Sequence, residues 1–198
     1  MTEPRLPPLY QGDLDPAQQA MWDALTAGGR GAKALREEGY LNGPFNVLLR
    51  SPEVGEAAGR LGELLRFSTD LSQRHRELVI VTVAAHWRAS YAWLRHVEYA
   101  RQGGVPEAVL SAIAAGAAPV LDDPVDHAVH AVVASLLATG AVPDDVYAEA
   151  VRLLGVQPVV ELVALAGYYC VCSFVLNTFR VALPVGADTP WTGEGTSR

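Results

Sequence analysis

Residues 77–97 read ELVIVTVAAHWRASYAWLRHV, and this stretch determines the fold that the sequence predicts. Its first half is apolar on nearly every side, which is typical of a helix buried in a core. Residues 88–90 interrupt the apolar run, and Ser90 is of a type that caps a new helix. The stretch therefore predicts a helical hairpin, whose two arms bring residues distant in sequence onto facing surfaces.

Glu77 and His96 are the polar residues that such a hairpin can bring together. A carboxylate is costly to bury unless it is paired, and a carboxylate beside an imidazole in an apolar pocket forms a proton-transfer pair. Two structural interpretations stay open. Glu77 can instead be stabilised by the helix dipole or by Arg74 or Arg76, and His96 can be an ordinary surface histidine.

Three further side chains of the hairpin are candidates for the site. Tyr91 lies near the start of the second arm, where it can donate a hydrogen bond beside helix amides that favour an anion. Trp93 is more often a packing residue. His86 follows Glu77 by nine positions, and nine steps of about 100° place it on the opposite side of one helix. His86 therefore requires a bent helix, or it serves a different surface such as a subunit interface.

The composition excludes several classes of function. The chain has 198 residues and 50% hydrophobic content, enough to bury the core of one domain. Its formal net charge of -7 argues against nucleic acid, whose phosphates require a basic face. A Schiff-base mechanism needs a desolvated lysine, and the single lysine, Lys33, lies in a polar stretch. His127 and His130 could share a metal ion, but their acidic neighbours equally describe a solvated helix, and we expect no metal.

The cysteines and the apolar segments indicate the compartment. Cys170 and Cys172 point away from each other on a helix, and the sequence has no Cys-x-x-Cys motif. The N-terminus lacks the apolar core of a signal peptide. Residues 162–179 are uncharged and reach the lower length limit of a membrane helix, but they have no basic flank. We expect a cytoplasmic protein without a membrane partner, and a buried helix in this segment.

Capping residues and prolines predict about eight helices, and no run alternates with period two for long enough to form a strand. Residues 1–14 are predicted to form an N-terminal arm, 15–183 a single all-α domain, and 184–198 a flexible tail. The helices are expected to begin at or near Asp15, Ser51, Ser72, Ser90, Val105, Asp122, Pro143 and Gln157.

Several short motifs resemble the carboxymuconolactone decarboxylase / alkylhydroperoxidase D-like family, and more specifically its decarboxylase-like branch. They are GPFNVLLRSPE at 43–53, LRF at 65–67, AHW at 85–87, Tyr91-x-Trp93 before His96, and ELVALAGYY at 161–169 followed by LN at 176–177. The resemblance covers roughly residues 20–184. It implies an alkylhydroperoxidase D-like helical bundle that assembles as a homo-oligomer, a trimer or a hexamer.

The resemblance also implies a function. The chain is expected to be a cofactor-independent acid–base lyase, catalysing decarboxylation, dehydration or isomerisation of a small carboxylated lactone or enolisable ring compound. We assign His96 as proton donor, Glu77 as the group that sets its tautomer, and Tyr91 as the donor to an oxyanion. The candidate substrate-binding residues are His86, Trp93, Phe45, Asn46, Tyr168, Tyr169 and Asn177, although on physical grounds the last five could all belong to the core.

The chain also departs from the family. The peroxidase branch has a Cys-x-x-Cys pair where this chain has Ala89 and Ala92, so a thiol peroxidase mechanism lacks its nucleophile. Relatives in the decarboxylase-like branch often have Glu at position 92. The competing interpretation is therefore a non-catalytic ligand-binding or assembly protein that keeps the fold without its chemistry.

Overall fold

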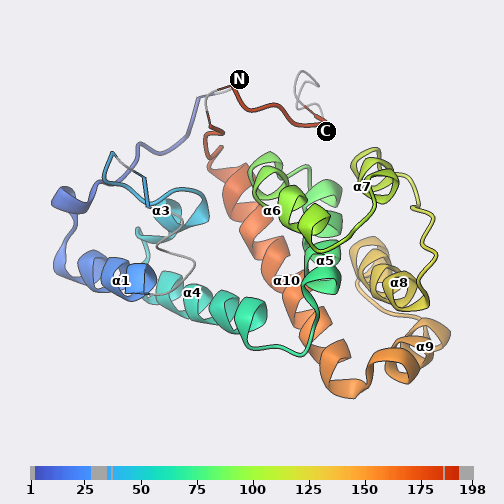
Figure 1. The fold of residues 1–198 in the computed structure, drawn as a ribbon. Helices are drawn as coiled ribbons and strands as arrows, with labels where there is room; N and C mark the ends of the chain where they lie inside the picture. Colours follow the sequence, from blue (N-terminus) through green and yellow to red (C-terminus); the bar gives the residue numbers. More distant parts are fainter. Residues whose placement is uncertain (1–2, 28–34, 37, 185, 192–198) are drawn as a thin grey trace. The chain divides into compact units, whose positions relative to one another are not determined.

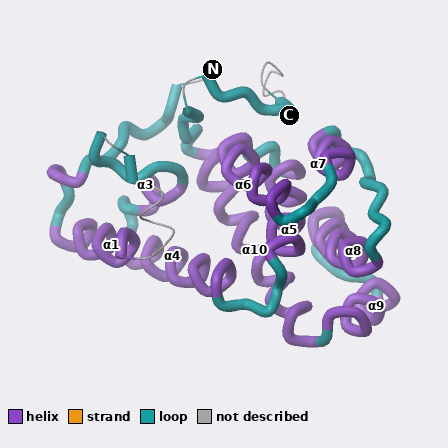
Figure 2. The backbone as a smooth tube through the Cα atoms, in the orientation of Figure 1, coloured by secondary structure: helices purple, strands orange, loops and turns teal. Residues whose placement is uncertain are grey.

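The computed structural model describes residues 3–27, 35–36, 38–184 and 186–191 (Figure 1). Nine α-helices and one short 3-10 helix, η1 (Gln11–Asp13), lie within these ranges, and their only β pairing is two isolated bridges (Figure 2). The all-α fold predicted from the sequence is confirmed. Contacts divide the chain into two compact units, Met1–Thr69 with Phe174–Ala182 and Asp70–Ser173 with Leu183–Arg198, here called the first and second units.

The first unit contains α1 (Pro16–Ala27), α3 (Pro44–Leu48) and α4 (Pro52–Phe67). Asp15 and Gln18 cap α1 reciprocally, since the side chain of each accepts a hydrogen bond from the backbone N–H of the other. Helix α4 presents buried glycines to α1, and a Cβ at Gly55 would lie 2.9 Å from the carbonyl oxygen of Leu48. The core of the unit consists of Met21, Trp22, Leu41, Phe45 and Leu49.

The second unit is built around α5 (Gln73–His86), which packs against α6 (Ser90–Gln102), α7 (Glu107–Ala114) and α8 (Pro124–Thr139). Helix α9 (Asp144–Leu154) packs against α8, and α10 (Val156–Thr178) follows it. Six apolar side chains of α5 have no exposed surface: Leu78, Val79, Ile80, Val81, Val83 and Ala84. The apolar run therefore forms a central helix, as the sequence predicted.

The two arms of the hairpin are α5 and α6. The start of α5 was predicted correctly from the sequence, and the start of α6 was not. Ser72 caps α5 through a 3.1 Å hydrogen bond from the backbone N–H of His75, which confirms the expected start. The prediction that Ser90 caps α6 is wrong. Ala89 occupies the cap position, Ser90 is the first helical residue, and the Ser90 hydroxyl lies 3.3 Å from the hydroxyl of Thr189.

The turn between the arms has an arginine where glycine is usual. Arg88 has φ 48°, in the left-handed region. The backbone N–H of Ala89 donates to the carbonyl of Ala84, and that of Arg88 donates to the carbonyl of Ala85, as in a Schellman motif that ends a helix. A left-handed backbone costs a non-glycine residue about 1–2 kcal/mol. The fold therefore retains a strained arginine at the tip of its central hairpin.

Helix α10 is apolar on two sides. By length and composition it could cross a membrane, but half of its most apolar window is buried within the protein. Its exposed side carries large apolar residues at helical spacing, namely Val156, Val160, Val163, Val171 and Phe174, with exposed Gly167 among them. Helix α10 therefore has an exposed apolar side in addition to the side that is buried in the core.

Candidate active site

Glu77 and His96 meet inside the second unit. His96 Nδ1 lies 2.7 Å from Glu77 Oε2, and the two residues are 7% and 1% exposed. Glu77 follows the first turn of α5, and His96 lies in the middle of α6. The hairpin thus brings together two polar residues separated by 19 positions in an otherwise apolar setting.

The hydroxyl of Tyr169, on α10, lies 3.3 Å from the other ring nitrogen, Nε2 of His96. The two rings also make an edge-to-face contact, with centroids 5.1 Å apart. An ionised Glu77 can only accept a hydrogen bond, so the imidazole proton belongs on Nδ1. In the neutral imidazole Nε2 then accepts from the tyrosine hydroxyl. Glu77, His96 and Tyr169 form a continuous hydrogen-bonded chain, which we call the buried relay.

Two other tyrosines were candidates for a role beside His96. Tyr91 is buried in the first turn of α6, and Tyr168 packs edge-to-face on Tyr169 with centroids 5.5 Å apart. The hydroxyl that the structure places on the imidazole is that of Tyr169, which sequence reasoning ranked only as a pocket residue. Its selection depends on the register between α10 and α6, and no signal in a single sequence reports that register.

Phe45, Asn46 and Asn177 belong to the first unit, whereas the buried relay belongs to the second. Phe45 is part of the first unit's core. The side-chain amide of Asn46 both donates to and accepts from the backbone of Leu9, at 2.8 and 2.9 Å. Asn177 is exposed near the end of α10. The contacts of Phe45 and Asn46 have a packing role, and the expected substrate-binding role of all three stays a prediction.

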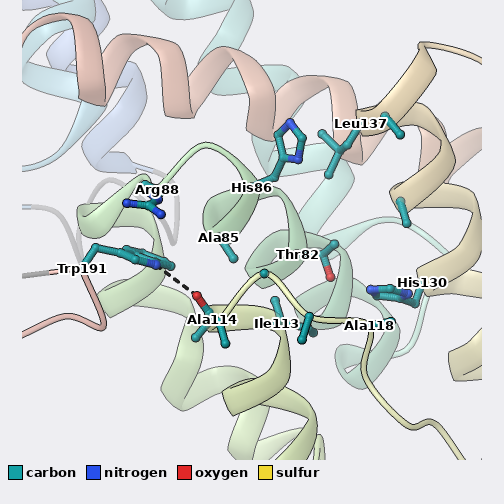
Figure 3. Close-up of a pocket in the computed structure, with 15 residues that line it drawn as sticks. Thr82, Ala85, His86, Arg88, Ile113, Ala114, Ala118, His130, Leu137 and Trp191 are labelled. Atoms are coloured by element: carbon teal, nitrogen blue, oxygen red, sulfur yellow. Dashed lines mark hydrogen bonds between the residues drawn. The ribbon is translucent and has the colours of Figure 1, made fainter. Parts of the chain in front are cut away.

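His86 lines a cleft of 560 Å³ on the second unit, and neither Glu77 nor His96 is among the residues that line it (Figure 3). Of the two interpretations of His86, the structure therefore favours a different surface of α5. The cleft is formed by the end of α5, by α7 and the segment after it, by α8, and by Trp191. Its lining residues are Thr82, Ala85, His86, Arg88, Ile113, Ala114, Ala115, Gly116, Ala117, Ala118, His130, Ala134, Leu137, Ala138 and Trp191.

The first part of the predicted tail packs against the second unit. The indole N–H of Trp191 donates to the carbonyl of Ala114 at 3.1 Å (Figure 3). Its ring meets that of Trp93 edge-to-face, with centroids 5.3 Å apart. Trp93 thus packs against a lining residue of the cleft, and its expected substrate-binding role stays a prediction. Residues 192–198 of the predicted tail lie outside the described residues.

The titratable or charged side chains that line the cleft are His86, Arg88 and His130. Burial is the main cause that lowers the pKa of His130, and the neighbouring His127 lowers it further. His75 also has a lowered pKa, mainly through burial, and Asp126 and Asp123 partly offset this effect. Among the described residues, no group of three His, Cys, Asp or Glu side chains is placed to hold a metal. Lys33 lies outside the described residues.

The cysteines lie on α10, away from the positions where a peroxidase would have them. Cys170 Sγ accepts a hydrogen bond from the indole N–H of Trp87 at 3.3 Å, and Cys172 is buried. Neither cysteine forms a disulfide bond within the described part of the chain. Ala89 and Ala92, at the positions of the Cys-x-x-Cys pair in the peroxidase branch, are buried methyl groups. The residues beside the relay thus carry no sulfur at those two positions.

Comparison with known proteins agrees with this architecture. The model of the carboxymuconolactone decarboxylase family matches residues 52–135, which include both Glu77 and His96. A protein of unknown function from Agrobacterium tumefaciens, named as a candidate AhpD antioxidant defence protein, is 20% identical. The alignment covers 71% of this chain and 97% of that one, with a TM-score of 0.62.

The debrominase Bmp8 has a similar structure at 11% identity. Its apo form aligns with a TM-score of 0.63 over 90% of this chain and 91% of its own. A cysteine-to-alanine variant of Bmp8 in complex with 2,3,4-tribromopyrrole aligns with a TM-score of 0.65, over 92% and 95% of the two chains, at 11% identity. At these identities the solved structures show the fold alone. No curated protein matches the sequence.

The match over residues 52–135 and the shared fold agree with the resemblance to the carboxymuconolactone decarboxylase / alkylhydroperoxidase D-like family that the sequence motifs predicted. Its fold is similar to that of the debrominase Bmp8.

Proposed function

We propose that the chain is a cofactor-independent lyase that applies acid–base chemistry to a small carboxylated lactone or an enolisable ring compound. The observation that carries the proposal is the buried relay, in which Glu77 and Tyr169 engage the two ring nitrogens of His96. Such an arrangement fixes the tautomer of the imidazole and provides a path for one proton. The family name and the small-ring complex of the debrominase support the substrate class.

Decarboxylation of this kind moves an electron pair and one proton. When the bond to CO₂ breaks, its electron pair stays on the substrate, where a neighbouring carbonyl holds it as an enolate. A proton must then reach carbon, and a donor must stabilise the enolate oxygen. In the proposed mechanism His96 reacts as the imidazolium: its Nε2 proton passes to the hydroxyl oxygen of Tyr169 as the hydroxyl proton passes to carbon, and the neutral imidazole then regains a proton from solvent. Glu77 stabilises the imidazolium whenever Nε2 is protonated, and Tyr91 donates to the oxyanion.

The test begins with a library of carboxylated lactones and enolisable ring acids, read by mass spectrometry for loss of CO₂ or water. Glu77→Gln and His96→Gln should each lower kcat by about 10²–10⁴, the usual range for general acid–base catalysis. The double variant should lose little more, because the two residues act as one unit. Tyr169→Phe removes the hydroxyl on His96, and Tyr168→Phe is its matched control. Additive losses, or unchanged turnover in all variants, would contradict the mechanism.

The chain is also proposed to function as a homo-oligomer, a trimer or a hexamer. The exposed apolar side of α10 supports this assembly, because exposed valines and Phe174 recur there at helical spacing around Gly167. A glycine at the centre of such a stripe allows close approach of another helix. Val160→Glu should dissociate the oligomer in light scattering, whereas Val54→Glu, at an exposed valine of α4, should not. A wild-type monomer at micromolar concentration would contradict the proposal.

A further inference from the structure

The first turn of α5 is tied by polar side chains to α6 and α8, which both pack against this helix (Figure 1). We infer that Asp126, acting through Arg74, is a positioning residue for the buried relay and fixes Glu77 opposite His96. The effect expected on turnover rests on the proposed function. The effect expected on the imidazole rests only on the geometry of the relay, so the two can fail separately.

Asp126 is a buried carboxylate on α8 whose side-chain partners come from α5. It is 2% exposed, and its Oδ1 and Oδ2 accept from Nε of Arg74 at 3.0 and 2.8 Å. Nε2 of His75 lies 3.5 Å from Oδ1, but burial is the main cause that lowers the pKa of His75. Arg74 is therefore the partner that is charged at neutral pH, and a buried carboxylate requires such a partner.

The start of α8 fixes the position of Asp126 itself. Asp123 caps this helix, and its side chain accepts from the backbone N–H of Val125 at 2.7 Å and from that of Asp126 at 3.3 Å. The cap holds the backbone of Asp126 while Arg74 holds its side chain. The carboxylate is thus a fixed point to which the first turn of α5 is attached.

The same guanidinium joins α5 to the turn that follows α6. Nη1 of Arg74 donates to the carbonyl of Gly104. The two backbones also meet there, since a Cβ at Gly103 would lie 3.1 Å from the Cα of Arg74. Beside Arg74, the side-chain amide of Gln73 donates to the carbonyl of Tyr99 at 3.1 Å. These contacts set the register between α5 and α6.

The contact between Gln73 and Tyr99 lies one helical turn from the relay. Gln73 precedes Glu77 by four residues along α5, and Tyr99 follows His96 by three residues along α6. A rigid helix transmits a displacement of its first turn to its second, and a hydrogen bond of 2.7 Å tolerates only a small displacement. Releasing the first turn of α5 from α8 should therefore lengthen the bond between Glu77 and His96 without removing either residue.

The test follows the proton on Nδ1 of His96 by proton–nitrogen NMR of the full-length protein with isotope-labelled histidines, and His96→Gln identifies the signal. A short hydrogen bond to the Glu77 carboxylate moves this proton downfield. Asp126→Asn keeps the size of the side chain but removes its charge, so the signal should move upfield. Arg74→Lys keeps a cation for Asp126 but lacks the planar fork that also reaches Gly104, so its signal should lie between the two. An unchanged signal in both variants would overturn the inference.

Two controls separate positioning from a loss of stability. Glu107→Gln breaks the 2.8 Å ion pair with Arg101, which joins α6 to α7 rather than to α5. Val132→Ala removes buried methyl groups from α8 and should lower the melting temperature, while it keeps the side-chain contacts of Asp126. Neither control should move the His96 signal. A shift in Val132→Ala as large as that in Asp126→Asn would overturn the inference, because it would assign the shift to loosened packing.

Turnover provides the second measurement. On any substrate that the wild type converts, Asp126→Asn should lower kcat by about tenfold or more and leave KM within about twofold, because a misplaced relay impairs proton transfer rather than binding. Glu107→Gln and Val132→Ala should keep the wild-type kcat. An unchanged kcat beside a shifted His96 signal would support the positioning of the imidazole and contradict its use in the proposed mechanism. A lowered kcat beside an unshifted signal would overturn the positioning role.

Discussion

Helix α5 carries polar residues on two faces, and the residues on the two faces differ in their burial and in their partners. On one face Glu77 is buried and paired with His96, which in turn meets Tyr169. On the other, His86 and Thr82 line an open cleft with Arg88 and His130. A buried carboxylate must have a partner, so the first face is one cooperative unit. At the cleft, His86 and Arg88 are exposed and His130 is half-buried, so we expect each of these side chains to change with less effect on the others.

The largest expected effect comes from removing one member of the buried relay. His96→Leu leaves the Glu77 carboxylate buried beside an apolar side chain, and breaking a buried pair in this way costs about 3–5 kcal/mol of unfolding free energy. His130→Leu is the matched change at the cleft, and it should cost less than about 1 kcal/mol, because His130 is only half-buried. Urea denaturation of both variants measures the difference. Equal losses would mean that the two faces do not differ in cooperativity.

A smaller effect should follow when both partners are replaced together. Glu77→Leu with His96→Leu removes the charge along with its partner, and apolar replacement of a buried ion pair is often neutral. The double variant should recover most of the stability that His96→Leu loses, to within about 1 kcal/mol of the wild type. It should have no turnover on any substrate found for the wild type. A double variant as unstable as His96→Leu would contradict the assignment of that loss to an unpaired buried carboxylate.

The same comparison shows which features could be predicted from the sequence. The central helix follows from an apolar run without a polar side, and Ser72 marks its start. The meeting of Glu77 with His96 follows from the hairpin, since both residues lie on its arms. These features depend on local pattern and on one turn.

Features that depend on the packing of distant segments could not be predicted. Tyr169 reaches His96 because of how α10 lies against α6, and its neighbour Tyr168 has the same local sequence context. The cap expected from Ser90 is absent, and the Ser90 hydroxyl instead meets that of Thr189, 99 positions later. The cleft is formed by α5, α7, α8 and Trp191, so no single sequence motif predicts it.

The smallest expected effect is a change in how the unfolding free energy depends on pH. It distinguishes the cleft face of α5 from the face that carries Glu77. Burial lowers the pKa of His130 below its ordinary value of 6.5, with His127 adding to the effect. Below the ordinary value the unfolded chain therefore binds a proton that the folded protein resists. Unfolding free energy should fall as pH decreases from above 6.5 toward the lowered pKa, and it should be regained as pH rises.

His130→Gln removes this term, so its loss of stability between about pH 7.5 and about pH 5.5 should be shallower than that of the wild type. His75→Gln is the matched comparison, because burial lowers the pKa of His75 as well, against the opposing pull of Asp126 and Asp123. Urea midpoints across the pH range measure both slopes. A steeper slope in His130→Gln would mean that His130 is protonated in the folded protein, and the cleft would then hold two cations rather than one.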